Sequence, residues 1–445
     1  MIVISRRRFL ALSGGLLATG CAATRSANPA LPSSPSSPSS PSATPAPLTA
    51  APTTTTTTTT TPGVVTTVST PTELASAALV DQPVLVLVEL RGGNDAVNTL
   101  PPLTGAYRDL RPTLSLAESD ILTSTALADH GLHPSLSPLL RFAESGRMAT
   151  LAGIGFDDPN RSHFVSMDRW ARADRLDDSL GWLGRWLDTL PDELTSLGAT
   201  SLGAVGEVAI GASKSATVID DVDAFAFPSM LSNATIRTLG ERPSNDPIVA
   251  AAQRAFVDSV GAIEEFDEIA DAVRARTPER DVDALGVQSG AYATGLAVAA
   301  EMILGDVGTR VVTISVNGFD THSDQLETHA ALLADLANGL SQFWATLDDA
   351  GASDRVLLAT TSEFGRRVAQ NASEGCDHGA AGVSFLMGNA VNGALFGALD
   401  TGDLLDGDLR PQLDPRLMFT ACLDWLGGDV DQILGKRYED IALLK

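Results

Sequence analysis

The sequence is poor in cysteine and in basic residues. Three cysteines (Cys21, Cys376 and Cys422) among 445 residues do not make a disulfide framework, so the fold must be stabilised by its core. Lysine and arginine number 30 against 55 acidic residues, which gives a net charge of −25. A field of that sign repels phosphate backbones, so we expect no nucleic-acid partner.

Long hydrophobic runs are also scarce at the N-terminus. The run from Ala11 to Ala18 is too short to span a bilayer, and it follows Ser5-Arg6-Arg7-Arg8-Phe9-Leu10. A basic start before a short apolar run is typical of a secretory signal, and this one resembles the twin-arginine signal. Residues 1–21 are therefore predicted to direct export by the twin-arginine route to the cell surface or periplasm.

Cys21 follows Gly20 at the end of this run, as in a lipoprotein cleavage site. We expect a lipid on Cys21, with a free or trimmed cysteine as the alternative. Residues 22–75, rich in Pro, Ser and Thr, cannot bury enough apolar surface to fold and are predicted to be a disordered tether. Contact with a membrane is expected only through the signal or the lipid.

Residues 76–445 are predicted to form one large α/β domain. Continuous apolar runs, typical of strands buried on both faces, occur at Val84–Val88, Met148–Ile154, Arg310–Val316 and Arg355–Thr361, with a shorter one at Ser384–Met387. A helical pattern runs from Leu326 to about Gly351 between two of them. This order predicts a mostly parallel sheet with helices on both faces. Residues from about 170 to 300 are predicted to be a partly helical insertion packed on it.

Polar clusters follow the predicted strands. Three of the six histidines fall in them, namely His163, His322 and His378. Carboxylates lie beside these histidines, at Asp95, Asp157, Asp320, Glu363 and Asp377. The carboxyl ends of parallel strands share one edge of a sheet, so we expect the clusters to converge there. Carboxylates and imidazoles suit a divalent cation such as zinc, manganese or magnesium.

Some residues in and around these clusters also have a purely structural explanation. Asp95 and Ser162 have the residue type and position of helix caps. His163 is explained equally well by a role in packing or hydrogen bonding. Arg366 and Arg367 either pair with acids or clamp an oxyanion.

Several segments resemble a family known as DUF1501, which consists of exported bacterial proteins that often carry twin-arginine leaders. The resemblance covers about residues 80 to 430. It rests on Leu90–Leu100, Asn160–Phe164, Gly181–Arg185, Gly318–His322, Ser362–Arg367 and Asp377–Gly379.

This family is similar to the alkaline phosphatase and sulfatase superfamily, which implies an alkaline-phosphatase-like fold with metal ions at the sheet edge. The resemblance implies a metal set of Asp95, Asp320, His322, Glu363 and His378. Two departures stand out. Phe364 occupies a usual ligand position, which puts a second metal in doubt. Asp157 stands where sulfatases have the Cys or Ser of Cys/Ser-x-Pro-x-Arg, which excludes formylglycine and leaves Ser162 as the next candidate nucleophile.

Two functions remain open at this stage. The first is a metal-dependent hydrolase of phosphate-type esters, in which Ser162 or water attacks and Arg161 or Arg366 binds the anionic group of the ester. The second is a non-catalytic, surface-tethered binding or assembly protein that retains the hydrolase fold. The sequence identifies neither the substrate nor a protein partner.

Overall fold

The computed structural model describes residues 82–445 apart from 192–193, 205, 220–231, 243, 277–289, 306 and 440. The export signal, Cys21 and the tether lie outside the described residues, so what was expected of them stays a prediction.

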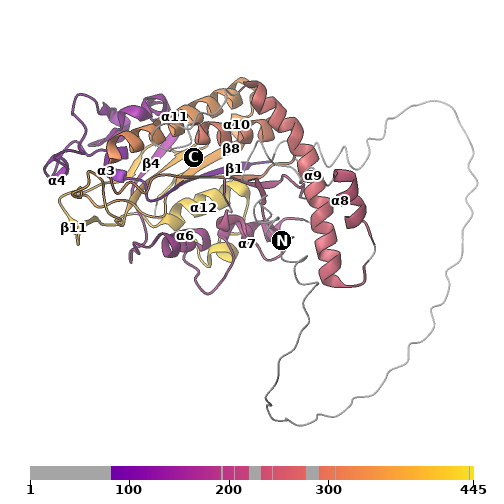
Figure 1. Cartoon of the computed structure of the whole chain (residues 1–445). Helices are drawn as coiled ribbons and strands as arrows, with labels where there is room; N and C mark the ends of the chain where they lie inside the picture. Colours follow the sequence, from indigo (N-terminus) through magenta and orange to yellow (C-terminus); the bar gives the residue numbers. More distant parts are fainter. Residues whose placement is uncertain are drawn as a thin grey trace, which may run out of the picture.

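An eight-stranded sheet forms the centre of the domain, in the order β10-β4-β9-β8-β1-β7-β5-β6 (Figure 1). Its strands are β1 (Val84–Arg91), β4 (Met148–Ile154), β5 (Ala199–Leu202), β6 (Thr217–Ile219), β7 (Val311–Asn317), β8 (Val356–Thr361), β9 (Gly382–Met387) and β10 (Leu395–Gly397). Two small hairpins lie outside it, β2 (Leu122–Thr123) with β3 (Gly131–Leu132) and β11 (Leu404–Leu405) with β12 (Asp408–Leu409). Strand β1 pairs in parallel with β7 and β8 on either side.

One strand runs against the others. Strand β9 is antiparallel to both β4 and β8, so β1, β4, β7 and β8 all point the same way. Because β9 is reversed, the residues before its start lie at the edge where the other strands end. Asp377 and His378, which precede β9, are therefore carried to the same edge as the clusters after β1, β4, β7 and β8.

Helices cover both faces of the sheet, and each face has its own hydrophobic core. The side chains of β1 alternate between them: Val84, Val86 and Val88 lie in one core, Leu85 and Leu87 in the other. The first core is covered by α5 (Ser137–Glu144), α10 (Ala291–Leu304) and α11 (Gln325–Asp349). The second is covered by α6 (His163–Arg172), α7 (Trp182–Thr189), α12 (Pro415–Leu426) and α13 (Val430–Leu434). The expected fold, a mostly parallel sheet between two helical layers, is confirmed.

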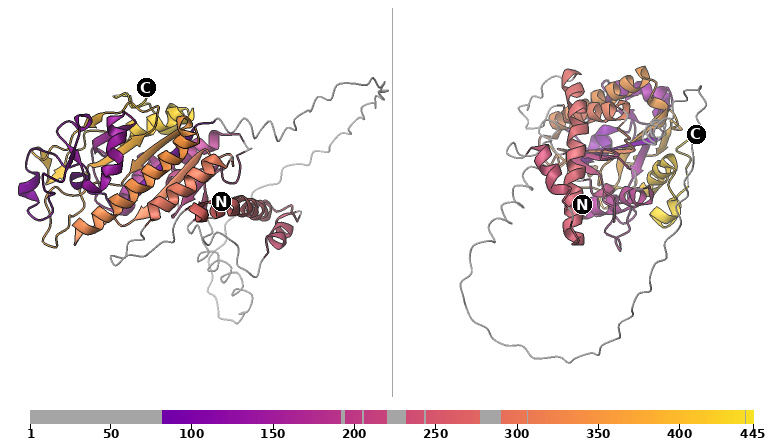
Figure 2. Two further views of the ribbon diagram at one scale, coloured as in Figure 1. Left: turned by 90° about the horizontal axis from the view of Figure 1, so that it is seen from above. Right: turned by 90° about the vertical axis from the view of Figure 1, so that its right-hand side faces the viewer.

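The stretch from about 170 to 300 differs from the expected insertion in one respect. Its strands β5 and β6 pair in parallel next to β7 and extend the main sheet itself. The rest of its described residues are largely helical, and α8 (Asn233–Gly240) and α9 (Pro247–Arg276) lie together at one end of the domain (Figure 2). The short helices α3 (Ala96–Thr99) and α4 (Tyr107–Leu110) lie at the other end (Figure 1). Among the described residues, no helix combines the length and the hydrophobicity needed to cross a membrane.

Candidate metal centre

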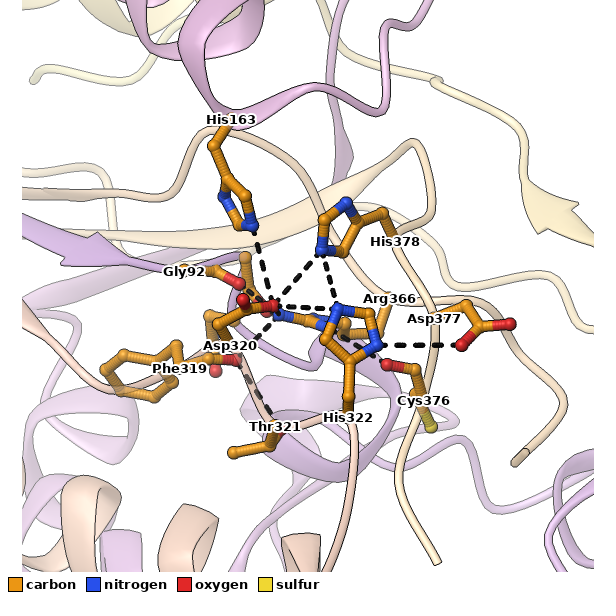
Figure 3. A network of polar contacts seen from close by, with 12 residues as sticks. Gly92, His163, Phe319, Asp320, Thr321, His322, Arg366, Cys376, Asp377 and His378 are labelled. Atoms are coloured by element: carbon orange, nitrogen blue, oxygen red, sulfur yellow. Dashed lines mark hydrogen bonds and ion pairs between the residues drawn. The ribbon is translucent and has the colours of Figure 1, made fainter. Parts of the chain in front are cut away.

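Four loops meet at the edge of the sheet where β1, β4, β7 and β8 end. They bring together four side chains that are far apart in the sequence: His163 at the start of α6, Asp320 and His322 after β7, and His378 before β9 (Figure 3). A glycine allows the loops to come this close. A Cβ atom at Gly92 would lie 2.3 Å from the backbone N of Asp320, and its φ of +117° is one that other residues rarely adopt.

Oδ1 of Asp320 is the hub of the cluster. It lies 3.0 Å from Nε2 of His322, 3.1 Å from Nε2 of His378 and 3.5 Å from Nε2 of His163. Arg366 also donates a hydrogen bond to it through Nη2, at 2.6 Å. Partial burial raises the pKa of Asp320, but the hydrogen bond from Arg366 and the contacts with the imidazoles of His378 and His322 outweigh it and lower the pKa to about 2. Asp320 is therefore ionised at any ordinary pH.

The outer nitrogens of two of the imidazoles are held by hydrogen-bond acceptors. Nδ1 of His378 lies 2.7 Å from the carbonyl oxygen of Arg161, and Nδ1 of His163 lies 2.8 Å from Oε1 of Glu363. A carbonyl can only accept, so Nδ1 of His378 carries the proton and Nε2 of the neutral ring presents a lone pair. Nδ1 of His322 lies 3.6 Å from Oδ1 of Asp377. All three Nε2 atoms thus point inward.

Nitrogen lone pairs placed this close to one another and to a carboxylate are stabilised by a positive charge between them. Nε2 of His322 and Nε2 of His378 are 2.9 Å apart, and Nε2 of His163 is buried without a hydrogen-bond partner in the described part of the chain. One ligand atom each from His163, Asp320 and His378 lies within 4.8 Å of the others. Ligand atoms about 2.0–2.1 Å from a tetrahedral cation are about 3.3 Å apart, close to the spacings around Asp320. The donor set fits a divalent cation.

Glu363 acts on the cluster through His163. Its side chain is 3% exposed, and Oε1 accepts a 2.9 Å hydrogen bond from the backbone N of Gly92. The hydrogen bond from His163 to Glu363 raises the pKa of His163, although partial burial opposes it. We expected Glu363 to bind the metal directly; the structure places its carboxylate against Nδ1 of His163, where it orients an imidazole, a common arrangement in metal sites.

Arg366 cannot serve as an anion clamp in this geometry. Its side chain is fully buried and its N–H groups are taken up by the protein: Nε donates to the carbonyl of Gly93 at 2.8 Å and Nη1 to that of Cys376 at 2.9 Å. Nη2 donates to the carbonyls of Gly92 and Phe319 and to Asp320. Arg366 is therefore a tie between the loops and a fixed positive charge on Asp320.

Asp95 lies outside the cluster, which corrects its assignment to the metal set. Its carboxylate is completely buried, and Nη1 and Nη2 of Arg111 donate to it at 2.5 and 2.9 Å. Gln325 donates to Oδ2, and the backbone N of Val97 donates to Oδ1 as at a helix N-cap. Burial raises the pKa of Asp95, but Arg111 outweighs it and the net pKa is lowered. With all its acceptor positions used, this carboxylate has a structural role.

The two remaining candidates lie just before His163. Ser162 is at the N-cap position of α6, but its side chain makes no capping hydrogen bond. The side chain of Arg161 turns towards Asp408 and forms an ion pair with it, while its carbonyl holds His378. Arg161 is thus next to the cluster without pointing a donor into it.

Phe364, at a position where the resemblance implied a ligand, packs against the imidazoles. It is buried, and its ring lies 4.9 Å from that of His163 and 4.8 Å from that of His378. The sequence placed His163 among the strand-end clusters but left it out of the metal set, because the resemblance offered no ligand position for it. The sequence signal for His163 was its position after a predicted strand. Only the fold shows that this position lies next to Asp320 and His378.

Comparison with known proteins identifies the family. Residues 155–434 match the model of the family described as protein of unknown function (DUF1501), and the chain belongs to this family. A search of curated proteins found no significant match.

Solved structures of similar architecture include hydrolases. They are the phosphonate monoester hydrolase of Silicibacter pomeroyi (TM-score 0.31, 10% identity, 81% of this chain and 78% of that chain), that of Agrobacterium radiobacter (0.33, 10%, 81% and 79%) and the PsFucS1 sulfatase of Pseudoalteromonas sp. (0.34, 10%, 81% and 72%). Identities of this size do not extend to a reaction or a substrate.

Proposed function

We propose that this chain is an exported, metal-dependent hydrolase of phosphate-type esters. The observation that carries the proposal is the set of three inward-facing Nε2 atoms around the ionised carboxylate of Asp320. His163, Asp320, His322 and His378 would hold the cation. Bound there, a divalent cation would supply polarisation of the ester and stabilisation of the negative charge on the leaving oxygen.

The residues around the cluster prepare it for this role. Glu363 and the carbonyl of Arg161 fix the tautomers of His163 and His378, so the ligand atoms need little rearrangement. Arg366 keeps Asp320 in place and ionised. Ser162 is the candidate nucleophile, since it adjoins His163 and its hydroxyl is not used to cap α6.

The cluster is open enough to admit a substrate. The side chains of Asp320 and His322 are 47% and 45% exposed, whereas those of His378 and His163 are 21% and 25% exposed. The exposed side offers an approach for an ester, and the buried side rests on Phe364. The surface-binding alternative would use the same cation without turnover, so activity decides between the two.

The test is to measure metal content and hydrolysis together on the full chain. Metals are quantified by elemental analysis. Hydrolysis is assayed with four p-nitrophenyl esters, namely the phosphate monoester, the phosphodiester, the phosphonate ester and the sulfate ester, with added zinc, manganese or magnesium. The proposal expects bound metal and turnover of at least one ester, with both lost in His378→Ala and in Asp320→Ala. Asp424→Asn, which removes one partner of an exposed ion pair with Arg437, is the matched control. Metal binding without turnover would favour the binding protein, and a folded chain without metal would refute the site.

A further inference from the structure

Beside His378, two arginines share one buried carboxylate. The side chain of Asp408 in β12 is 2% exposed, and its Oδ2 accepts hydrogen bonds from Nε of Arg161, at 2.9 Å, and from Nη2 of Arg161. Its Oδ1 lies 3.6 Å from Nε of Arg367. The side chains of Arg161 and Arg367 are 44% and 36% exposed, so both guanidinium groups reach solvent.

Both arginines are anchored to the segment that carries His378. The carbonyl of Arg161 accepts from His378 itself, and the backbone N of Arg367 donates to the carbonyl of Asp377 at 3.0 Å. Their side chains therefore start next to the metal centre and end on one common carboxylate. Both side chains thus branch from backbone that is hydrogen-bonded to the segment carrying His378.

The pair is more than the hairpin of β11 and β12 requires. Arg161 alone already gives Asp408 two hydrogen bonds, whereas Arg367 makes none to it and donates to the carbonyl of Asp406 instead, at 3.1 Å. Oδ1 of Asp408 remains buried without a hydrogen-bond donor among the described residues. Arg161 and Arg367 thus lie side by side around Asp408, with the exposed Asp406 as the other acid next to them, in a protein whose net charge is −25.

We propose that Arg161 and Arg367 form a second anion subsite, so that the substrate carries a further carboxylate, sulfate or phosphate beside the ester that is cleaved. Guanidinium groups bind such planar or tetrahedral oxyanions through paired N–H donors. The inference rests on the proposed function, because it assumes that the ester sits on the cluster. It narrows the substrate class to esters with at least two anionic groups.

Binding of stable phosphonates to the manganese-loaded full chain tests this by calorimetry. Phenylphosphonate presents one anionic group, and the meta and para isomers of phosphonobenzoate add a carboxylate that is too distant to bind the same metal. At least one isomer should bind about tenfold more tightly than phenylphosphonate, as one charge-assisted hydrogen bond would give. Arg367→Gln, which leaves the Arg161–Asp408 pair to hold the hairpin, should abolish this gain and leave phenylphosphonate unaffected.

The control is Arg410→Gln, which removes an exposed arginine that follows β12 and pairs with Asp403. It should change neither affinity. If phenylphosphonate binds but neither isomer gains affinity, or if the gain survives in Arg367→Gln, the second subsite is refuted while the proposed function stands. If no phosphonate binds in a metal-dependent way, the proposed function fails and the subsite fails with it.

Discussion

Replacing Asp95 by alanine should damage the fold and leave the metal centre intact in the molecules that remain folded. Within the described part of the chain, Asp95 is the sole carboxylate that contacts Arg111, whose side chain is fully buried and otherwise bonded to Asn98 and to the carbonyls of Val368 and Arg367. Without Asp95, a guanidinium charge would be left in the interior with neutral partners alone. This is a different outcome from the loss of a metal ligand.

The magnitude follows from the burial of both partners. Breaking a buried ion pair by removing one member costs about 3–5 kcal/mol. Losing the cap on α3, where the backbone N of Val97 donates to Asp95, costs about 1 kcal/mol more. A total of about 4–6 kcal/mol is a large share of the roughly 5–15 kcal/mol that stabilises a typical domain. Asp95→Asn should cost less, since the amide oxygen can still accept hydrogen bonds from Arg111.

Urea unfolding followed by tryptophan fluorescence measures this loss, with elemental analysis of the folded fraction alongside. Asp348→Ala is the control, because its bidentate pair with Arg147 lies at the surface and such pairs contribute about 0–1 kcal/mol. The argument would be refuted if Asp95→Asn unfolded at the wild-type urea concentration but contained no metal. That result would return Asp95 to the metal set.

Three further predictions concern the cluster and the buried histidines. Glu363→Gln should lower metal affinity about 10- to 100-fold, measured by competition with a chelator, because it weakens the hold on His163 without removing a ligand. Metal affinity should also decrease as the pH is lowered, and the decrease should begin above the ordinary histidine pKa of about 6.5, because Glu363 raises the pKa of His163 and the proton competes with the cation. In Glu363→Gln the same decrease should occur at lower pH. Burial lowers the pKa of His329 to about 3, so on acidification this histidine is protonated in the unfolded chain before it is protonated in the folded one. The free energy of unfolding in urea should therefore fall as the pH drops from about 6.5 towards 3, and His329→Gln should flatten that dependence.

Much of the fold was predictable because its signals are local. Five of the eight strands of the sheet are apolar runs that read as buried strands, and α11 shows its helical period over 25 residues. The short strands β5, β6 and β10 were missed, since four, three and three residues carry too little pattern to separate them from loop. The reversed direction of β9 is also absent from its sequence, because an apolar run reads the same in either orientation.

The candidate site was predictable in position, but only part of the set of side chains that face one another there could be predicted. Strand ends mark the edge where Asp320, His322 and His378 meet, and this depends on the sheet alone. Which neighbouring carboxylate faces the cluster depends on partners that are distant in sequence. Glu363 is hydrogen-bonded to Gly92 and His163, and the spacing of residues within its own segment does not predict those contacts.

Asp95 and Asp320 show why residue type and strand-end position cannot settle a ligand set. Both follow a strand of the same sheet and a glycine-containing turn, and both are bound by an arginine. Arg111 takes both oxygens of Asp95 and Gln325 closes off what remains, whereas Arg366 takes one oxygen of Asp320 and leaves that side chain 47% exposed among three imidazoles. The arginine thus neutralises one aspartate and merely steadies the other. A divalent cation needs a carboxylate that is ionised, accessible and incompletely satisfied, and of these two only Asp320 meets all three conditions.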